Sequence, residues 1–255
     1  SSSTETILDL GKSPVANNLE LDKTKSQKSK KYALNLILCK SKCTHVQIGK
    51  IVDQKEIFKD YYYMPSISKT LTGHLQSISK DIDQRFKIKK DSFIVDIGSN
   101  DGTFLESASH YSKKILGIDP AKNLSDLANK KGIKTINNFF SSNLSKAIKN
   151  DYGYADFIVS TNTFAHTPEV NDFVKGLNEL ISDEGVIIIE IHYLGSMIED
   201  NSFDTIYHEH FSYWSLENLN FIFNKYELNI FDVSFLDILL CISSSLNMEM
   251  NSSFY

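Results

Sequence analysis

The sequence predicts an α/β fold in which helices cover both faces of a parallel sheet. Three observations support this prediction. Apolar runs suited to strands alternate with amphipathic stretches suited to helices from about residue 66 to residue 238. The runs are apolar throughout, as expected of parallel strands that are buried on both faces. A glycine-containing turn, residues 98–102, lies between one such run and the helix that follows.

The first 65 residues predict a small domain of their own. Residues 1–30 surround one short apolar stretch, ILDL, with Gly11 and Pro14 as turn formers, which indicates a compact but irregular start. Residues 32–38 (YALNLIL) and 45–51 (HVQIGKI) each predict a strand, with a tight turn between them. We expect this hairpin-like unit to be too small to be stable alone.

The main domain spans residues 66–238. Apolar residues recur every three or four positions over residues 66–86, which predicts an amphipathic helix that leads into the domain. The predicted strands are residues 93–98, 114–119, 134–137, 156–161, 185–191 and 227–238. The predicted helices begin near residue 103 and span residues 121–131, 143–149, 169–181 and 215–225. Residues 239–255 read as a divergent tail that only partly replaces the final strand.

The composition argues against several classes of partner. A net charge of −5 and a pI near 5.8 lack the basic excess that binding to nucleic acid needs. No apolar run approaches the roughly 18 residues that span a bilayer, and the start has no signal-peptide pattern, so we expect a cytoplasmic protein that binds no membrane. Three cysteines are too few for a disulfide framework and indicate a reducing compartment.

The stretch VDIGSNDGT, residues 95–103, is the strongest signal for a ligand. Glycines at a turn between a strand and a helix let the backbone approach a ligand closely, and the N–H groups that start the helix can face an anionic group. A carboxylate, Asp119, follows the next strand and is suited to two ribose hydroxyls. Both features predict a nucleoside cofactor.

The spacing of the turn favours S-adenosylmethionine over a nicotinamide dinucleotide. Gly98 and Gly102 are four residues apart, and Asn100 replaces the middle glycine of the dinucleotide pattern. Asp96 adds a carboxylate inside the strand, which disfavours a pyrophosphate and suits the cationic amino-acid end of S-adenosylmethionine. The candidate cofactor residues are Asp96, Gly98, Asn100, Asp101, Gly102, Asp119, Pro120, Phe139, Asn162 and Phe164.

Some of these candidates come from segments that follow later strands. Phe139 follows the third strand, where an aromatic ring is placed either to enclose adenine or to fill the core. Asn162, Phe164 and His166 follow the fourth strand, at the carboxyl edge where open α/β sheets bind ligands. His166 is placed to face the transferred methyl group or the substrate.

Residues 203–211, FDTIYHEHF, concentrate ionisable side chains in consecutive positions. The H-E-x-x-H spacing of zinc peptidases is absent, so acid–base chemistry is the better functional interpretation. The competing interpretation is structural: a solvent-exposed loop that contains two histidines by chance. With the DIGSNDG and TNTFAH segments upstream, the F-D-x-I-Y-x-E-H-F pattern resembles the sugar C-methyltransferase family, which acts on nucleotide-activated deoxysugars. The resemblance extends to the first domain. It includes residues 8–11 (LDLG) with Pro14, residues 16–17 (AN), residues 39–47 and residues 60–63 (DYYY).

The resemblance implies a Rossmann-like class I S-adenosylmethionine-dependent methyltransferase domain beside a small zinc-ribbon-like N-terminal domain. It implies methyl transfer to the carbon next to the keto group of a nucleotide-linked 4-keto-deoxysugar, the small-molecule partner. His210 is the candidate base, and Tyr207 would hydrogen-bond the enolate or keto oxygen. Glu209 would orient or tune His210, while Tyr63 and His166 would complete the pocket.

The sequence departs from that family in two places. The family binds zinc through two cysteine pairs, whereas Cys39 and Cys43 form one pair, spaced C-x3-C, and zinc would have half of its ligands. A His-Gly-Gly-Ser segment and a further domain that follow in the family are absent after residue 238, which we interpret as a truncation. The alternatives are therefore a non-catalytic protein that binds S-adenosylmethionine and an O- or N-methyltransferase of small molecules.

Overall fold

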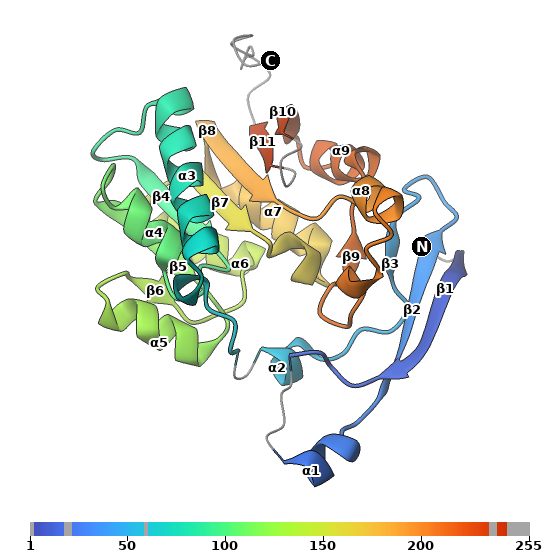
Figure 1. The fold of residues 1–255 in the computed structure, drawn as a ribbon. Helices are drawn as coiled ribbons and strands as arrows, with labels where there is room; N and C mark the ends of the chain where they lie inside the picture. The colour runs from blue at the N-terminus through green and yellow to red at the C-terminus, as the bar shows by residue number, and fades with distance from the viewer. Residues whose placement is uncertain (1–2, 18–21, 59–60, 235–238, 244–255) are drawn as a thin grey trace.

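The computed structural model describes residues 3–17, 22–58, 61–234 and 239–243, and its centre is a seven-stranded sheet (Figure 1). The strands lie in the order β10-β11-β8-β7-β4-β5-β6, and β8 to β6 pair in parallel. The predicted α/β fold with a parallel sheet is confirmed. The strands are β4 (Phe93–Ile97), β5 (Lys114–Ile118), β6 (Thr135–Ile136), β7 (Ala155–Thr161), β8 (Ile181–Glu190), β10 (Asn229–Ser234) and β11 (Leu239–Ser243).

Helices cover both faces of this sheet because its strands are apolar on both sides. Side chains of α3 (Lys69–Phe86), α4 (Thr103–Ala108) and α5 (Lys122–Lys130) share one buried cluster with Ile94, Val159 and Ile188. Side chains of α6 (Ser142–Tyr152), α7 (Val170–Leu180) and α9 (Leu216–Asn224) share another with Val95 and Ile189. Neighbouring residues of one strand belong to different clusters, because successive side chains of a strand point to opposite faces of the sheet.

The end of the main sheet differs from the predicted single strand over residues 227–238. β10 ends at Ser234, and β11, residues 239–243, inserts between β10 and β8 and pairs antiparallel with both. Residues predicted to belong to the tail therefore extend the sheet. The rest of that tail, residues 244–255, lies outside the described residues.

A second, four-stranded sheet forms most of the small domain. Its order is β1 (Thr4–Ser13), β2 (Tyr32–Cys39), β3 (Val46–Ile48) and β9 (Ser212–Tyr213), and every pair is antiparallel. The start predicted to be irregular is therefore the strand β1, although bulges interrupt its pairing. Because β9 comes from residues 212–213, the small domain includes a segment far beyond residue 65.

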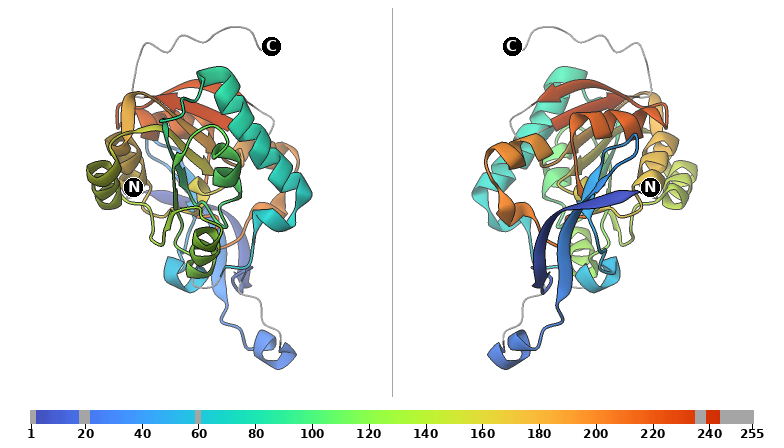
Figure 2. Two further views of the ribbon diagram at one scale, coloured as in Figure 1. Left: turned by 90° about the vertical axis from the view of Figure 1, so that its left-hand side faces the viewer. Right: turned by 90° about the vertical axis from the view of Figure 1, so that its right-hand side faces the viewer.

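The segment between β8 and β9 joins the two sheets. It contains α8 (Leu194–Glu199) and η3 (Phe203–Thr205), and its Ile206 and Phe211 are buried against Leu34, Ile48 and Phe58 of the small domain. On the other side, α2 (Gln54–Ile57) and η1 (Pro65–Ile67) lead into α3, while α1 (Lys23–Gln27) protrudes from the body of the molecule (Figure 2). The apolar core of the small domain is thus completed by the segment that carries the predicted catalytic residues.

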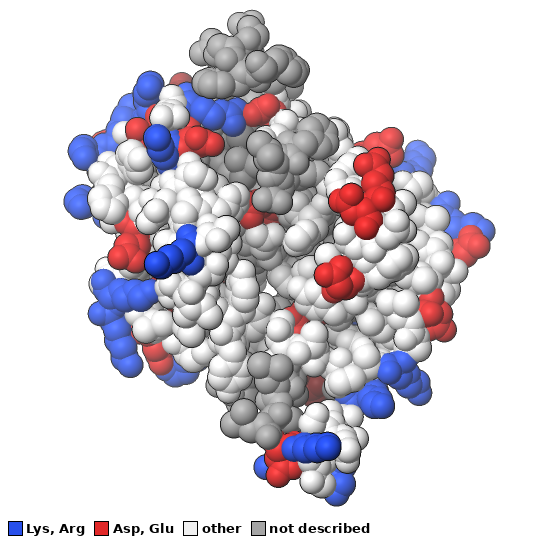
Figure 3. Space-filling model, in the orientation of Figure 1, with Lys and Arg blue, Asp and Glu red and all other residues white. Residues whose placement is uncertain are grey.

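On the face drawn in Figure 3, Lys and Arg side chains lie mostly towards the periphery, whereas acidic side chains also lie close to the central hollow. Among the described residues, no helix is long and apolar enough to cross a bilayer.

Candidate active site

A cavity of about 1240 Å³ lies at the carboxyl edge of the parallel strands. This edge is where open α/β sheets bind ligands, because the chain leaves each strand there in a loop. The wall is completed by residues of the small domain and of the segment between β8 and β9. Ten of the fifteen predicted cofactor and catalytic residues line it: Tyr63, Gly98, Asn100, Asp119, Pro120, Phe139, Asn162, His166, Tyr207 and His210.

The glycine turn approaches the cavity in a left-handed backbone conformation, which glycine adopts without strain and other residues do not. Gly98 has φ +77°, and a Cβ there would collide with the side chain of Thr163. The N–H groups of Gly98 and Ser99 donate to the carbonyl of Ile118, at 2.8 and 3.1 Å, and the N–H of Asn100 donates to Asp119 at 2.8 Å. These three N–H groups, which precede the start of α4, are therefore already satisfied within the protein.

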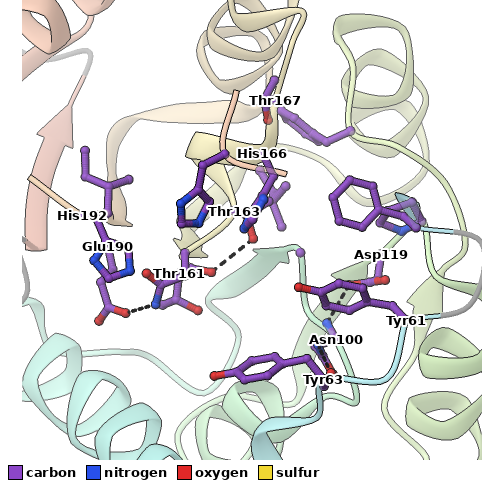
Figure 4. Close-up of a pocket in the computed structure, with 18 of the residues that line it drawn as sticks. Tyr61, Tyr63, Asn100, Asp119, Thr161, Thr163, His166, Thr167, Glu190 and His192 are labelled. Atoms are coloured by element: carbon purple, nitrogen blue, oxygen red, sulfur yellow. Dashed lines mark hydrogen bonds between the residues drawn. The ribbon is translucent and has the colours of Figure 1, made fainter. Parts of the chain in front are cut away.

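Asp119 presents a fixed carboxylate at the end of β5. Its Oδ2 accepts the N–H of Asn100 and its Oδ1 accepts the N–H of Ala121, both at 2.8 Å. Each oxygen keeps a further lone pair for a ligand hydroxyl. Burial raises the pKa of Asp119 to about 6, although the two N–H donors act in the opposite direction. In Figure 4, Asp119 lies across the cavity from Glu190 and His192.

Asp96 does not reach the cavity, which corrects the expectation that it contacts the cofactor. Its side chain lies within β4, is 2% exposed and does not belong to the cavity wall. Burial, reinforced by the charge of Asp119, raises the pKa of Asp96 to about 8, so the group is mostly protonated at pH 7. A neutral carboxyl group cannot balance the charge of a cationic ligand.

Three other predicted cofactor residues also turn inward. Phe164 is fully buried in the core and stacks on Trp214 with ring centroids 4.8 Å apart. Asp101 is fully buried and accepts the hydroxyl of Thr103 at 2.6 Å. Gly102 has φ +82° at the start of α4 and also lies outside the cavity wall. These residues shape the turn and the core, so we correct their assignment as direct contacts.

Tyr207 and His210 form a hydrogen-bonded pair on the cavity wall. The Nδ1 of His210 lies 2.8 Å from the carbonyl oxygen of Thr205 and must carry the hydrogen, since a carbonyl only accepts. In the neutral ring, Nε2 then accepts the hydroxyl of Tyr207 at 2.8 Å. Burial lowers the pKa of His210 to about 3, and burial raises the pKa of Tyr207. Both groups are therefore neutral near pH 7.

His166 brings a second imidazole to the same wall. Its ring centroid is 4.8 Å from that of His210, and its Nδ1 donates to the carbonyl of Glu209 at 2.7 Å. Nε2 is therefore the unprotonated nitrogen of the neutral ring. Burial lowers the pKa of His166 to about 4. Tyr63 is 55% exposed, and its carbonyl accepts the side-chain amide of Asn100 at 2.9 Å.

Glu209 has a different partner from the one predicted. Its carboxylate accepts the backbone N–H of Asn17 at 3.0 Å and also the side-chain amide of Asn17. Both nitrogens of His210 are bonded elsewhere, so Glu209 does not orient that ring, and this expectation is corrected. Because Asn17 lines the cavity, the carboxylate instead fixes a piece of the small domain in the wall.

We expect Asn17→Ala to lower the free energy of unfolding by about 1–3 kcal/mol, because it removes a donor from a buried carboxylate. Urea unfolding measures this loss. A double-mutant cycle with Glu209→Gln separates the pair from other effects. If Asn17→Ala costs as much in the Glu209→Gln background as in the wild type, the two side chains are not coupled and the interpretation is wrong.

Sequence reasoning missed several residues of the wall. Asn17 and Tyr61 belong to the AN and DYYY segments of the family resemblance, but no local pattern indicates that they reach the main sheet. Glu190 and His192 follow β8 at the carboxyl edge, so their position after a predicted strand was an available signal. His74 lies on α3 and is recognisable as part of the site only from the fold.

Cys39 ends β2 and Cys43 lies in the turn that leads to β3, with their sulfur atoms 3.0 Å apart. A structural zinc ion needs four such ligands. The described part of the chain contains no group of three or more His, Cys, Asp or Glu side chains arranged to hold a metal ion. The described residues therefore do not by themselves fit a zinc site.

The cavity fits S-adenosylmethionine by three observations. It contains the carboxylate of Asp119 at the end of β5, and only a glycine fits beside Thr163 in the turn after β4. Its described lining includes five carboxyl groups and no lysine or arginine, which favours a cationic ligand over a pyrophosphate. Its volume is sufficient for a nucleoside cofactor together with a small substrate.

Known proteins match both parts of the chain. A family model described as "Methyltransferase domain" matches residues 72–233, and one described as "Putative zinc binding domain" matches residues 1–58. The C-methyltransferase NovU of Streptomyces niveus is 28% identical over 232 residues, which cover 91% of this chain and 55% of that protein. The chain thus spans about half the length of this relative.

Solved structures resemble the fold. The PH0226 protein of Pyrococcus horikoshii OT3 aligns with a TM-score of 0.56 and 11% identity, covering 76% of this chain and 99% of that chain. An S-adenosylmethionine-dependent methyltransferase of Clostridium acetobutylicum ATCC 824 aligns with a TM-score of 0.51 and 11% identity, covering 70% and 93%. At these identities the likeness concerns the fold alone.

Proposed function

The chain belongs to the methyltransferase domain family, and from this membership we propose that it methylates the carbon beside the keto group of a nucleotide-linked 4-keto-deoxysugar. S-adenosylmethionine is the methyl donor in this proposal. The observation that supports carbon as the acceptor is the pair Tyr207–His210, which sits with His166 on the wall of the same cavity as Asp119 and Gly98. Methylation of oxygen or nitrogen needs no base strong enough to remove a proton from carbon, because those atoms already carry a lone pair.

His210 is the proposed base, and Tyr207 is the proposed donor to the developing enolate. In the structure the hydroxyl of Tyr207 donates to His210 Nε2. A keto oxygen in the cavity would compete for that hydroxyl and free Nε2 to take the α-proton, while the electron pair moves towards the oxygen. When bound, S-adenosylmethionine supplies an electrophilic methyl group that the carbon attacks, with the sulfur leaving as a neutral thioether.

The charge of the wall indicates which part of the substrate lies inside. The five carboxyl groups of the described lining would repel a diphosphate, and there is no lysine or arginine in that lining to hold one. A neutral sugar ring has hydroxyl groups that suit the tyrosines and histidines of the wall. We therefore place the sugar in the cavity and the nucleotide outside it.

We expect the protein to exchange the α-hydrogen of a dTDP-4-keto-6-deoxysugar with deuterium from D₂O, as measured by NMR. With labelled S-adenosylmethionine, the label should appear on a carbon of the sugar ring.

Calorimetry should show binding of S-adenosylmethionine and S-adenosylhomocysteine but not NAD. Transfer of the label to oxygen or nitrogen would reject carbon as the acceptor, and binding without any transfer would indicate a non-catalytic protein.

A further inference from the structure

Glu190 is a buried carboxylate in the cavity wall with no role in the chemistry described above. It ends β8, is 3% exposed and accepts the side-chain amide of Asn162 at 2.5 Å. Its other oxygen contacts Nε2 of His74, which reaches the site from α3. Figure 4 shows Glu190 beside His192, on the opposite side of the cavity from Asp119. Two donors from different elements thus fix the carboxylate in place.

The cofactor brings a positive charge that Asp96 cannot balance, because Asp96 is mostly protonated at pH 7 and lies outside the wall. Five carboxyl groups line the cavity: Asp119, Glu169, Asp172, Glu190 and Asp200. Asp119 has the position that suits a ribose, and Asp172 lies on α7, where it is only partly buried and binds Ser142 at the start of α6. Glu169 and Asp200 are exposed, so water screens their charges. Glu190 is the remaining buried carboxylate.

The strand order places Glu190 at a suitable distance from the ribose position. Asp119 follows β5 and Glu190 ends β8, with β4 and β7 between them. Three strand spacings separate them by about 14 Å. A nucleoside extended by an amino-acid chain spans such a distance, with its sulfur above the turn of Gly98. The α-ammonium group then lies at the Glu190 end of the cavity.

We propose that Glu190 binds the α-ammonium group of S-adenosylmethionine, with His74 and Asn162 as the residues that position its carboxylate. The inference rests on the cofactor assigned under the proposed function and not on the identity of the methyl acceptor. Each oxygen of Glu190 uses one lone pair for its protein partner and keeps another for the ammonium hydrogens. A charge-assisted hydrogen bond in a buried site is among the stronger polar contacts.

Glu190→Gln tests this proposal by calorimetry with three ligands. S-adenosylmethionine and S-adenosylhomocysteine carry the α-ammonium group, whereas 5′-methylthioadenosine has the same nucleoside without the amino-acid end. We expect the variant to bind the first two about tenfold or more weakly and to bind 5′-methylthioadenosine as the wild type does. Glu169→Gln, which neutralises an exposed carboxylate of the same cavity, should leave all three affinities unchanged.

Each other outcome overturns the assignment. An equal loss for all three ligands means that Glu190 only maintains the shape of the site, and a loss for S-adenosylmethionine alone places its charge at the sulfonium. No loss for any ligand rejects a contact. A wild-type protein that binds the cofactor but methylates no keto-sugar would reject the proposed substrate and leave this inference intact.

Discussion

His210→Asn should lower kcat for methyl transfer by about 10²–10⁴-fold, the usual contribution of a general base. The affinity for S-adenosylmethionine should stay the same, because His210 bonds to Thr205 and Tyr207 and is not among the residues assigned to the cofactor. Asparagine keeps a donor for the Thr205 carbonyl but has no basic nitrogen. Steady-state kinetics and calorimetry on the same preparation separate the two effects.

The pH profile tests the same assignment independently. The pKa of His210 is lowered from 6.5 to about 3 by burial, so the free enzyme keeps this base unprotonated well below pH 6. With S-adenosylmethionine saturating, so that the titration of Asp119 near pH 6 does not limit cofactor binding, we expect kcat/KM for the keto-sugar to stay nearly constant from pH 8 to pH 5, where an ordinary histidine would lose its basicity. The unfolded chain binds protons at His166 and His210 below about pH 6.5, whereas the folded chain does so only near pH 4 and pH 3, so these two histidines destabilise the fold as the pH is lowered through that window. Asp96 and Asp119, whose pKa values are raised, act in the opposite direction. The folded fraction must therefore be measured at each pH.

A matched variant at the neighbouring ring identifies the base. His166→Asn keeps the donor to the Glu209 carbonyl and removes the neighbouring imidazole, one of three besides His210 that line the cavity. If His210 is the base, deuterium exchange into the keto-sugar should be lost in His210→Asn and retained in part in His166→Asn. The reverse pattern would assign the proton transfer to His166. Tyr207→Phe should slow exchange as well, since it removes the donor proposed for the enolate oxygen.

The sheet was predictable from sequence because a parallel strand buried on both faces is apolar throughout, as in FIVDI and GVIIIE. The small domain was less predictable. β1 reads as irregular because its side chains are mostly exposed and bulges break its alternation. β9 is two residues long and pairs with β3, more than 160 positions earlier in the chain. No local pattern encodes such a contact.

The site was predictable where the position of a residue follows from the end of a strand. Gly98, Asp119 and Asn162 follow three neighbouring parallel strands, and all three line the cavity. Side-chain direction was not predictable in the same way. Asp96 lies next to the wall but points into the protein, because one step along the backbone reverses the face that a strand residue occupies. Phe164 begins the short helix η2 (Phe164–His166), which places its ring in the core against Trp214.

Gly98→Ala should destabilise the fold more than any other substitution proposed for this chain. Alanine at φ +77° carries a backbone cost of about 1–2 kcal/mol. Its Cβ would also collide with Thr163, and the overpacking of a buried site typically costs a further 1–3 kcal/mol. Because the N–H groups of the turn donate to Ile118 and Asp119, a shift that relieved the collision would also move the carboxylate assigned to the ribose.

Gly132→Ala is the matched control for this prediction. Gly132 has a similar φ of +84°, but a Cβ there would meet nothing within 4 Å, so only the backbone cost applies. Urea unfolding should give a loss near 1–2 kcal/mol for Gly132→Ala and a larger one for Gly98→Ala. Only the Gly98 variant should also lose binding of S-adenosylmethionine. Equal losses of stability, with cofactor binding intact in both, would mean that the turn of Gly98 has room for a side chain and that its close contact with Thr163 does not shape the site.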